Sequence, residues 1–122
     1  MGGRGQFSEN KFNGVYEWFT VRIIVGKKYA AKILDSNTKH KLPEESHSPN
    51  AIYARLNEKG KIYQVRIYEN HIPVYDIDIT HEHSPFGKPH VHKYENGKRI
   101  AMEFNDHFKD ILDDLGIDYD KK

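Results

Sequence analysis

Cysteine is absent from this chain of 122 residues, and that absence excludes several kinds of chemistry. Without thiols there are no disulfides, no thiolate nucleophiles and no thiolate zinc sites, which fits a reducing compartment. Long apolar runs are also missing, whereas a membrane-spanning helix needs about 20 largely apolar residues in succession. The chain does not open on the charged and then apolar segments of a secretory signal peptide. We therefore expect a soluble cytoplasmic protein that makes no contact with a membrane.

A strong charge of either sign is missing as well. The 19 lysines and arginines nearly balance the 18 aspartates and glutamates, so the net charge is only +1. Without a broad basic field, an RNA partner must be bound by a local patch. One tryptophan, eight tyrosines and six phenylalanines supply large side chains for one modest core. We expect a single domain over residues 15–116, between a flexible N-terminal segment, residues 1–14, and a disordered tail, residues 117–122.

The pattern of apolar residues predicts an α+β fold. Ordered structure is expected from Val15 on, and apolar side chains then recur at every second position, at Phe19, Val21, Ile23 and Val25, which is typical of a strand. Further strands are predicted at residues 29–34, 52–56, 62–68, 72–80, 90–94 and 99–103. The pair Asn96-Gly97 favours a tight hairpin turn between the last two, and Asn105 and Gly116 suit the two ends of an amphipathic C-terminal helix. We expect an antiparallel meander of about six strands with that helix packed on one face.

Carboxylates and imidazoles gather between residues 76 and 92. Because side chains alternate across a strand, Asp76 and Asp78 share one face, while the opposite, apolar row runs on into His81 and His83. After a short loop, two more imidazoles share a face of the next strand, at His90 and His92. If the loop folds back, all four histidines converge near one edge of the sheet.

Two kinds of chemistry use such a cluster. A neutral imidazole binds transition metals, and a His-x-His pair on a strand directs two nitrogens to one point. Zinc or another transition metal bound by His81, His83, His90 and His92, completed by an aspartate, is therefore one interpretation. The other needs no cofactor: one imidazole deprotonates a ribose 2′-hydroxyl and a second protonates the leaving 5′-oxygen. A nearby cation then stabilises the phosphate charge, and the candidates are Lys88, Lys93 and Arg99.

Part of the chain, about residues 61–99, resembles C-terminal domains of phage-encoded and polymorphic toxins. The similarity is carried by residues 62–68, Asp76-Ile77-Asp78, His81, Pro89-His90-Val91-His92 and Gly97-Lys98-Arg99. Those domains are grouped with the barnase, EndoU, colicin and RelE type of metal-independent ribonucleases. The opening Met1-Gly2-Gly3-Arg4-Gly5 also resembles the start of small prophage proteins. The resemblance implies a ribonuclease-like site made of Asp76, Asp78, His81, His90, His92 and Arg99.

Three hypotheses arise from the sequence. The first is a small phage- or mobile-element-type protein that cleaves RNA with His92 and His81 as acid and base. The second is an interaction module of a prophage without chemistry, which binds a host or phage protein through an exposed sheet edge and the polar loop at residues 35–50. The third is a metal-binding domain built on the His-x-His pairs.

Overall fold

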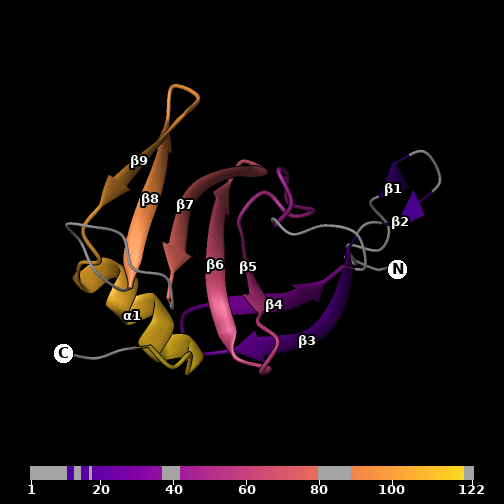
Figure 1. The fold of residues 1–122 in the computed structure, drawn as a ribbon, viewed down its shortest axis with the longest axis horizontal. Helices are drawn as coiled ribbons and strands as arrows, with labels where there is room; N and C mark the ends of the chain where they lie inside the picture. Colours follow the sequence, from indigo (N-terminus) through magenta and orange to yellow (C-terminus); the bar gives the residue numbers. More distant parts are fainter. Residues whose placement is uncertain (1–10, 13–14, 17, 37–41, 80–88, 120–122) are drawn as a thin grey trace.

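The computed structural model describes residues 11–12, 15–16, 18–36, 42–79 and 89–119. Within these residues the chain forms nine strands followed by one helix (Figure 1). The strands are β1 (Lys11–Phe12), β2 (Val15–Tyr16), β3 (Phe19–Val25), β4 (Ala30–Asp35), β5 (Ala51–Leu56), β6 (Ile62–Glu69), β7 (Ile72–Asp78), β8 (His90–Glu95) and β9 (Lys98–Met102), and the helix is α1 (Asp106–Leu115).

Strands β3 to β9 form one open sheet in the order of the sequence, while β1 and β2 pair only with each other. The predicted α+β class is confirmed, since the main sheet is mostly antiparallel and a C-terminal helix follows it. Two details of the prediction are corrected. The main sheet has seven strands rather than about six, and it is not a pure meander because β4 and β5 run parallel. A parallel pair needs a connection that returns to the starting end, and the long segment between these strands provides it.

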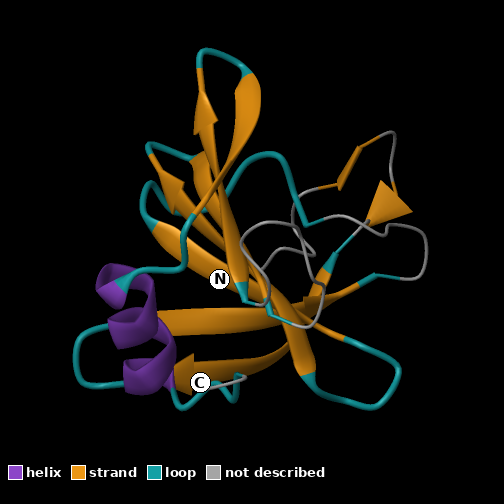
Figure 2. Ribbon diagram, turned by 60° about the vertical axis from the view of Figure 1, so that its left-hand side comes forward, coloured by secondary structure: helices purple, strands orange, loops and turns teal. Residues whose placement is uncertain are grey.

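Helix α1 covers one face of the sheet, as Figures 1 and 2 show from two sides. Its apolar stripe is buried, as the 3.6-residue period predicts: Phe108, Ile111, Leu112 and Leu115. These side chains join a core cluster with Ile33 of β4, Val65 of β6, Ile77 of β7 and Val91 of β8. The helix has ten residues, and within the described ranges no helix has the length and apolarity needed to cross a lipid bilayer.

A carboxylate of the helix, Asp114, binds the turn of the β3–β4 hairpin. The carboxylate of Asp114 accepts hydrogen bonds from the backbone nitrogens of Lys27, Lys28 and Tyr29, at 2.9–3.0 Å. Desolvation opposes its ionisation, but these backbone donors outweigh that effect and lower the pKa of Asp114. Gly26 begins this turn, and a β-carbon there would overlap both the side-chain Oδ2 and the backbone carbonyl oxygen of Asp114. The turn therefore has no room for a side chain at this position.

The opposite face of the sheet is divided between an apolar and a polar half. A second core cluster lies over β4, β5 and β6 and consists of Trp18, Leu34, Leu42, Tyr53 and Tyr68. Polar side chains of β6 to β9 occupy the remainder of this face. The predicted domain limits at residues 15 and 116 stay a prediction, and the helix-side core includes Ile117, just beyond the second limit.

Candidate functional site

The register of four strands brings the polar side chains of this face together. Asp76 pairs with His92 and Asp78 with His90 across β7 and β8. On the other side of β7, Asp76 pairs with Arg66 of β6. Residues directly opposite each other in an antiparallel ladder point to the same face of the sheet. The aspartates and imidazoles predicted from the sequence therefore share one surface.

Asp78, His90 and His92 form a compact group that we call the triad. Asp78 Oδ2 lies 3.2 Å from His90 Nε2 and 3.4 Å from His92 Nδ1. The two imidazole rings meet edge to face, with centroids 4.9 Å apart. One ligand atom from each residue lies within 4.8 Å of the other two. His90 is 1% exposed and His92 is 9% exposed, so the group is largely withdrawn from water.

The second carboxylate oxygen of Asp78 is held by a neighbouring strand. Gln64 on β6 donates its side-chain amide to Asp78 Oδ1 at 3.2 Å. This hydrogen bond fixes the plane of the carboxylate and leaves Oδ2 directed at the imidazoles. Side chains that orient a ligating carboxylate in this way are a regular part of metal sites.

Asp76 has a different environment from Asp78 although the two lie two residues apart. Its carboxylate is fully buried and accepts hydrogen bonds from Arg66 Nε at 2.6 Å and Arg66 Nη2 at 2.9 Å. It also accepts from the Tyr94 hydroxyl at 2.5 Å and from Arg99 Nη2 at 3.1 Å. Desolvation favours the protonated acid, but the Arg66 contacts outweigh it and lower the pKa of Asp76. Asp76 is thus a buried anion at the centre of an ion-pair network.

Arg66 connects that network to the segment that precedes β5. Its Nη1 donates to the backbone carbonyl oxygens of Leu42 at 2.8 Å and Pro43 at 3.2 Å. Desolvation disfavours its charge, yet the Asp76 carboxylate raises the pKa of Arg66 above its usual value. Since Arg66 and Asp76 are both buried and matched, their pairing orders the strands around the triad.

Arg99 supplies the cation beside the imidazoles. Its side chain is 41% exposed, and its Nη2 lies 3.6 Å from Asp78 Oδ2 as well as beside Asp76. Of the other cations predicted for this role, Lys93 pairs in register with Tyr75 of the helix-facing core and bonds to Glu95 at 3.2 Å. Lys88 lies outside the described residues.

The structure thus brings Asp76, Asp78, His90, His92 and Arg99 onto one surface, while their roles stay predictions. His81 and His83 lie outside the described residues, so the convergence of four histidines also stays a prediction. Sequence reasoning missed three members of the network: Gln64, Arg66 and Tyr94. Alternation along a single strand does not say which face of the sheet these side chains share with the aspartates; the register between strands decides that.

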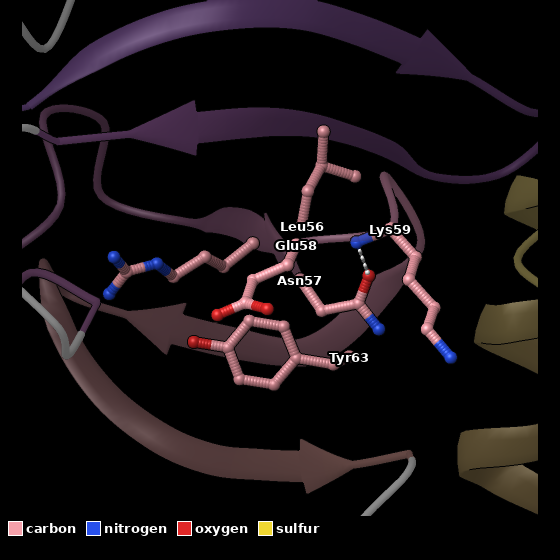
Figure 3. Close-up of a pocket in the computed structure, with 6 residues that line it drawn as sticks. Leu56, Asn57, Glu58, Lys59 and Tyr63 are labelled. Carbon is pink, nitrogen blue, oxygen red and sulfur yellow. Dashed lines mark hydrogen bonds between the residues drawn. The ribbon is translucent and has the colours of Figure 1, made fainter.

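A separate hollow of about 490 Å³ lies at the turn between β5 and β6, with Arg55, Asn57, Glu58 and Tyr63 among the residues that line it (Figure 3). In this turn the side-chain oxygen of Asn57 accepts from the backbone nitrogen of Lys59, at 2.9 Å. The residues that line this hollow include no member of the triad. We take the triad as the candidate site, because the ligand atoms of two buried imidazoles and one partly buried carboxylate converge there, whereas the hollow follows the outline of a turn.

Comparisons of the chain with protein-family models, curated proteins and solved structures gave no match. The resemblance to toxin-type ribonuclease domains therefore stays a prediction. Among the described residues, the triad and the side chains around it are the features that point to a function.

Proposed function

We propose that the protein binds one divalent transition-metal ion through Asp78, His90 and His92. The observation that carries the proposal is the convergence of one carboxylate oxygen and two imidazole nitrogens within 4.8 Å, in a largely buried position. Ligand atoms about 2.0–2.2 Å from a tetrahedral zinc ion lie about 3.3–3.6 Å from one another. The two Asp78–imidazole separations, 3.2 and 3.4 Å, are close to that spacing.

The donor set selects the class of metal. Two imidazoles and one carboxylate suit zinc and ferrous iron, whereas magnesium and calcium prefer oxygen ligands. A set of three protein ligands leaves at least one coordination position open to water or substrate, as in catalytic rather than structural sites. A zinc ion bound in this way lowers the pKa of a water ligand to about 7. The proposed activity is therefore metal-assisted chemistry, of which hydrolysis is the simplest form.

Zinc titration of chelator-treated protein by calorimetry tests the proposal. We expect one equivalent of zinc to bind, and we expect Asp78→Asn and His92→Ala each to weaken binding by at least about tenfold, since even loss of a supporting side chain has such an effect. His107→Gln is the matched control, because His107 is an exposed residue of α1, and this helix packs on the face of the sheet opposite the triad. Binding that is absent from the wild type, or unchanged in Asp78→Asn, would rule the site out.

Metal-free cleavage of RNA is the second candidate, and the position of Arg99 favours it. The guanidinium lies beside the triad and is 41% exposed, as a group that stabilises phosphate charge should be. In this reaction His92 and His81 act as acid and base. RNA incubated with the protein should give 2′,3′-cyclic ends in the presence of a chelator, and His92→Ala should abolish them. RNA that stays intact over a broad pH range, with and without zinc, argues against this candidate.

A further inference from the structure

Arg99 is a second cation at the Asp76 carboxylate, which Arg66 already binds through both oxygens. Arg66 contacts both oxygens of Asp76 through Nε and Nη2, and the Tyr94 hydroxyl adds a third hydrogen bond. Of the two Asp76 oxygens, Arg99 contacts only Oδ2, at 3.1 Å from Nη2 and 3.3 Å from Nε. Its Nε also donates to the Tyr94 hydroxyl at 3.3 Å, and its Nη2 lies 3.6 Å from Asp78 Oδ2. Among the described residues its Nη1 has no hydrogen-bond partner, and the side chain is 41% exposed. Part of the guanidinium thus remains available to a ligand.

The charge of the site changes when a metal ion is present. With neutral imidazoles, the two carboxylates of Asp76 and Asp78 are balanced by the guanidinium groups of Arg66 and Arg99. A divalent ion bound by Asp78 adds two positive charges next to Arg99, whose Nη2 lies 3.6 Å from the ligating oxygen. Uncompensated charge is strongly unfavourable in a largely buried place. The loaded site therefore favours a negatively charged ligand.

We propose that the metal-loaded triad binds a small oxyanion, a phosphate or carboxylate group of the substrate, between the metal ion and Arg99. This inference rests on the metal site proposed above. One oxygen of the group takes the open metal position, and a second accepts hydrogen bonds from Arg99. A planar guanidinium matches the spacing of phosphate and carboxylate oxygens, which a lysine ammonium does not. Arg99 lies on β9, the last strand of the sheet order, so the ligand approaches from that edge.

Calorimetric titration of apo and zinc-loaded protein with inorganic phosphate and with acetate tests the proposal, and zinc affinity is measured separately for every variant. We expect an oxyanion to bind the zinc-loaded wild type far more tightly than the apo protein, and the tighter of the two probes identifies the class. Arg99→Gln should weaken oxyanion binding by at least about tenfold, which corresponds to the loss of one charge-assisted hydrogen bond. Its zinc affinity should stay the same or rise, because a neighbouring positive charge has been removed.

Two further variants keep the test decisive. Arg99→Lys retains the positive charge and loses the planar pair of N–H donors of the guanidinium. It should therefore fold even if Arg99→Gln does not, and it should bind the oxyanion more weakly than the wild type. Arg22→Gln, on the opposite edge strand β3, removes an exposed arginine and should change neither affinity. Zinc binding without oxyanion binding, or equal oxyanion binding in Arg99→Gln, Arg99→Lys and the wild type, overturns this inference alone. A wild type that binds no zinc overturns the metal site together with it.

Discussion

Replacing Asp76 by asparagine should destabilise the fold more than any change at an exposed acid. The substitution preserves the shape of the side chain and removes a charge that is 0% exposed. It leaves Arg66, 7% exposed, with a buried guanidinium that has lost its counter-ion. The two backbone carbonyls that Arg66 also contacts satisfy hydrogen bonds but not charge.

The expected loss of stability can be worked out from this geometry. Two unit charges about 4 Å apart interact by about 4 kcal/mol at an effective dielectric constant of about 20. Removal of one member of a buried pair typically costs about 3–5 kcal/mol. We therefore expect Asp76→Asn to lower the free energy of unfolding by about 3–5 kcal/mol and the melting temperature by about 10–20 °C, given the size of the chain.

Urea unfolding measures the effect directly. Trp18 is the single tryptophan and is 5% exposed, so its fluorescence reports the loss of the core, with far-ultraviolet circular dichroism as a second probe. Asp118→Asn, an exposed acid, is the control and should change stability by less than about 0.5 kcal/mol. The double variant Arg66→Met with Asp76→Leu should recover much of the loss, because neither charge remains buried alone. A loss below about 1 kcal/mol in Asp76→Asn would refute this reasoning.

Three shorter predictions concern pH, packing and the triad. The pKa of Asp76 lies below its usual value of 3.8 in the folded protein. The ionised carboxylate therefore stabilises the fold at neutral pH, and this stabilisation is lost as the pH falls through the folded pKa. Urea midpoints should drop more steeply below about pH 4 in the wild type than in Asp76→Asn. Gly26→Ala should lower the free energy of unfolding by about 1–3 kcal/mol, because the new β-carbon would overlap Asp114 Oδ2 and the Asp114 carbonyl oxygen; the melting temperature of the variant checks this. Gln64→Leu should weaken zinc binding by about 10–100-fold through a loosened Asp78 carboxylate, measured by calorimetry; unchanged affinity would show that the amide does not orient the ligand.

Local sequence signals predicted the turns of this fold because the backbone itself requires particular residues there. Asn96 and Gly97 adopt φ angles of 52° and 77°, and Gly116 ends the helix at 70°, conformations that asparagine and glycine tolerate best. Asn105 caps the helix by accepting from the backbone nitrogen of His107, as its position predicted. Each of these features depends on residues only a few positions apart.

Features that depend on residues far apart in the sequence were not predicted, because local patterns carry no information about them. The parallel pairing of β4 with β5 joins two strands that a long stretch of sequence separates, and no local pattern records that these strands become neighbours. The contact of Arg66 with Asp76 depends on the register of β6 against β7. That register follows from the turn at Asn70 and His71, where both residues have positive φ. The cluster of aspartates and histidines could be predicted because its members lie on two strands that are neighbours in sequence. Of its supporting residues, Gln64 and Arg66 come from β6, whereas Tyr94 lies on β8 itself.

The parallel pairing also has a consequence for the order of folding. From β5 to β9 every neighbouring pair is formed by consecutive strands, so this part of the sheet can assemble by successive hairpins between residues close in the chain. Strand β4 can join only after a longer loop has closed, which carries a larger entropic cost. We expect the strands that hold Asp78, His90 and His92 to come together before the β3–β4 hairpin docks. A metal ion present during refolding should therefore accelerate an early kinetic phase rather than the last one.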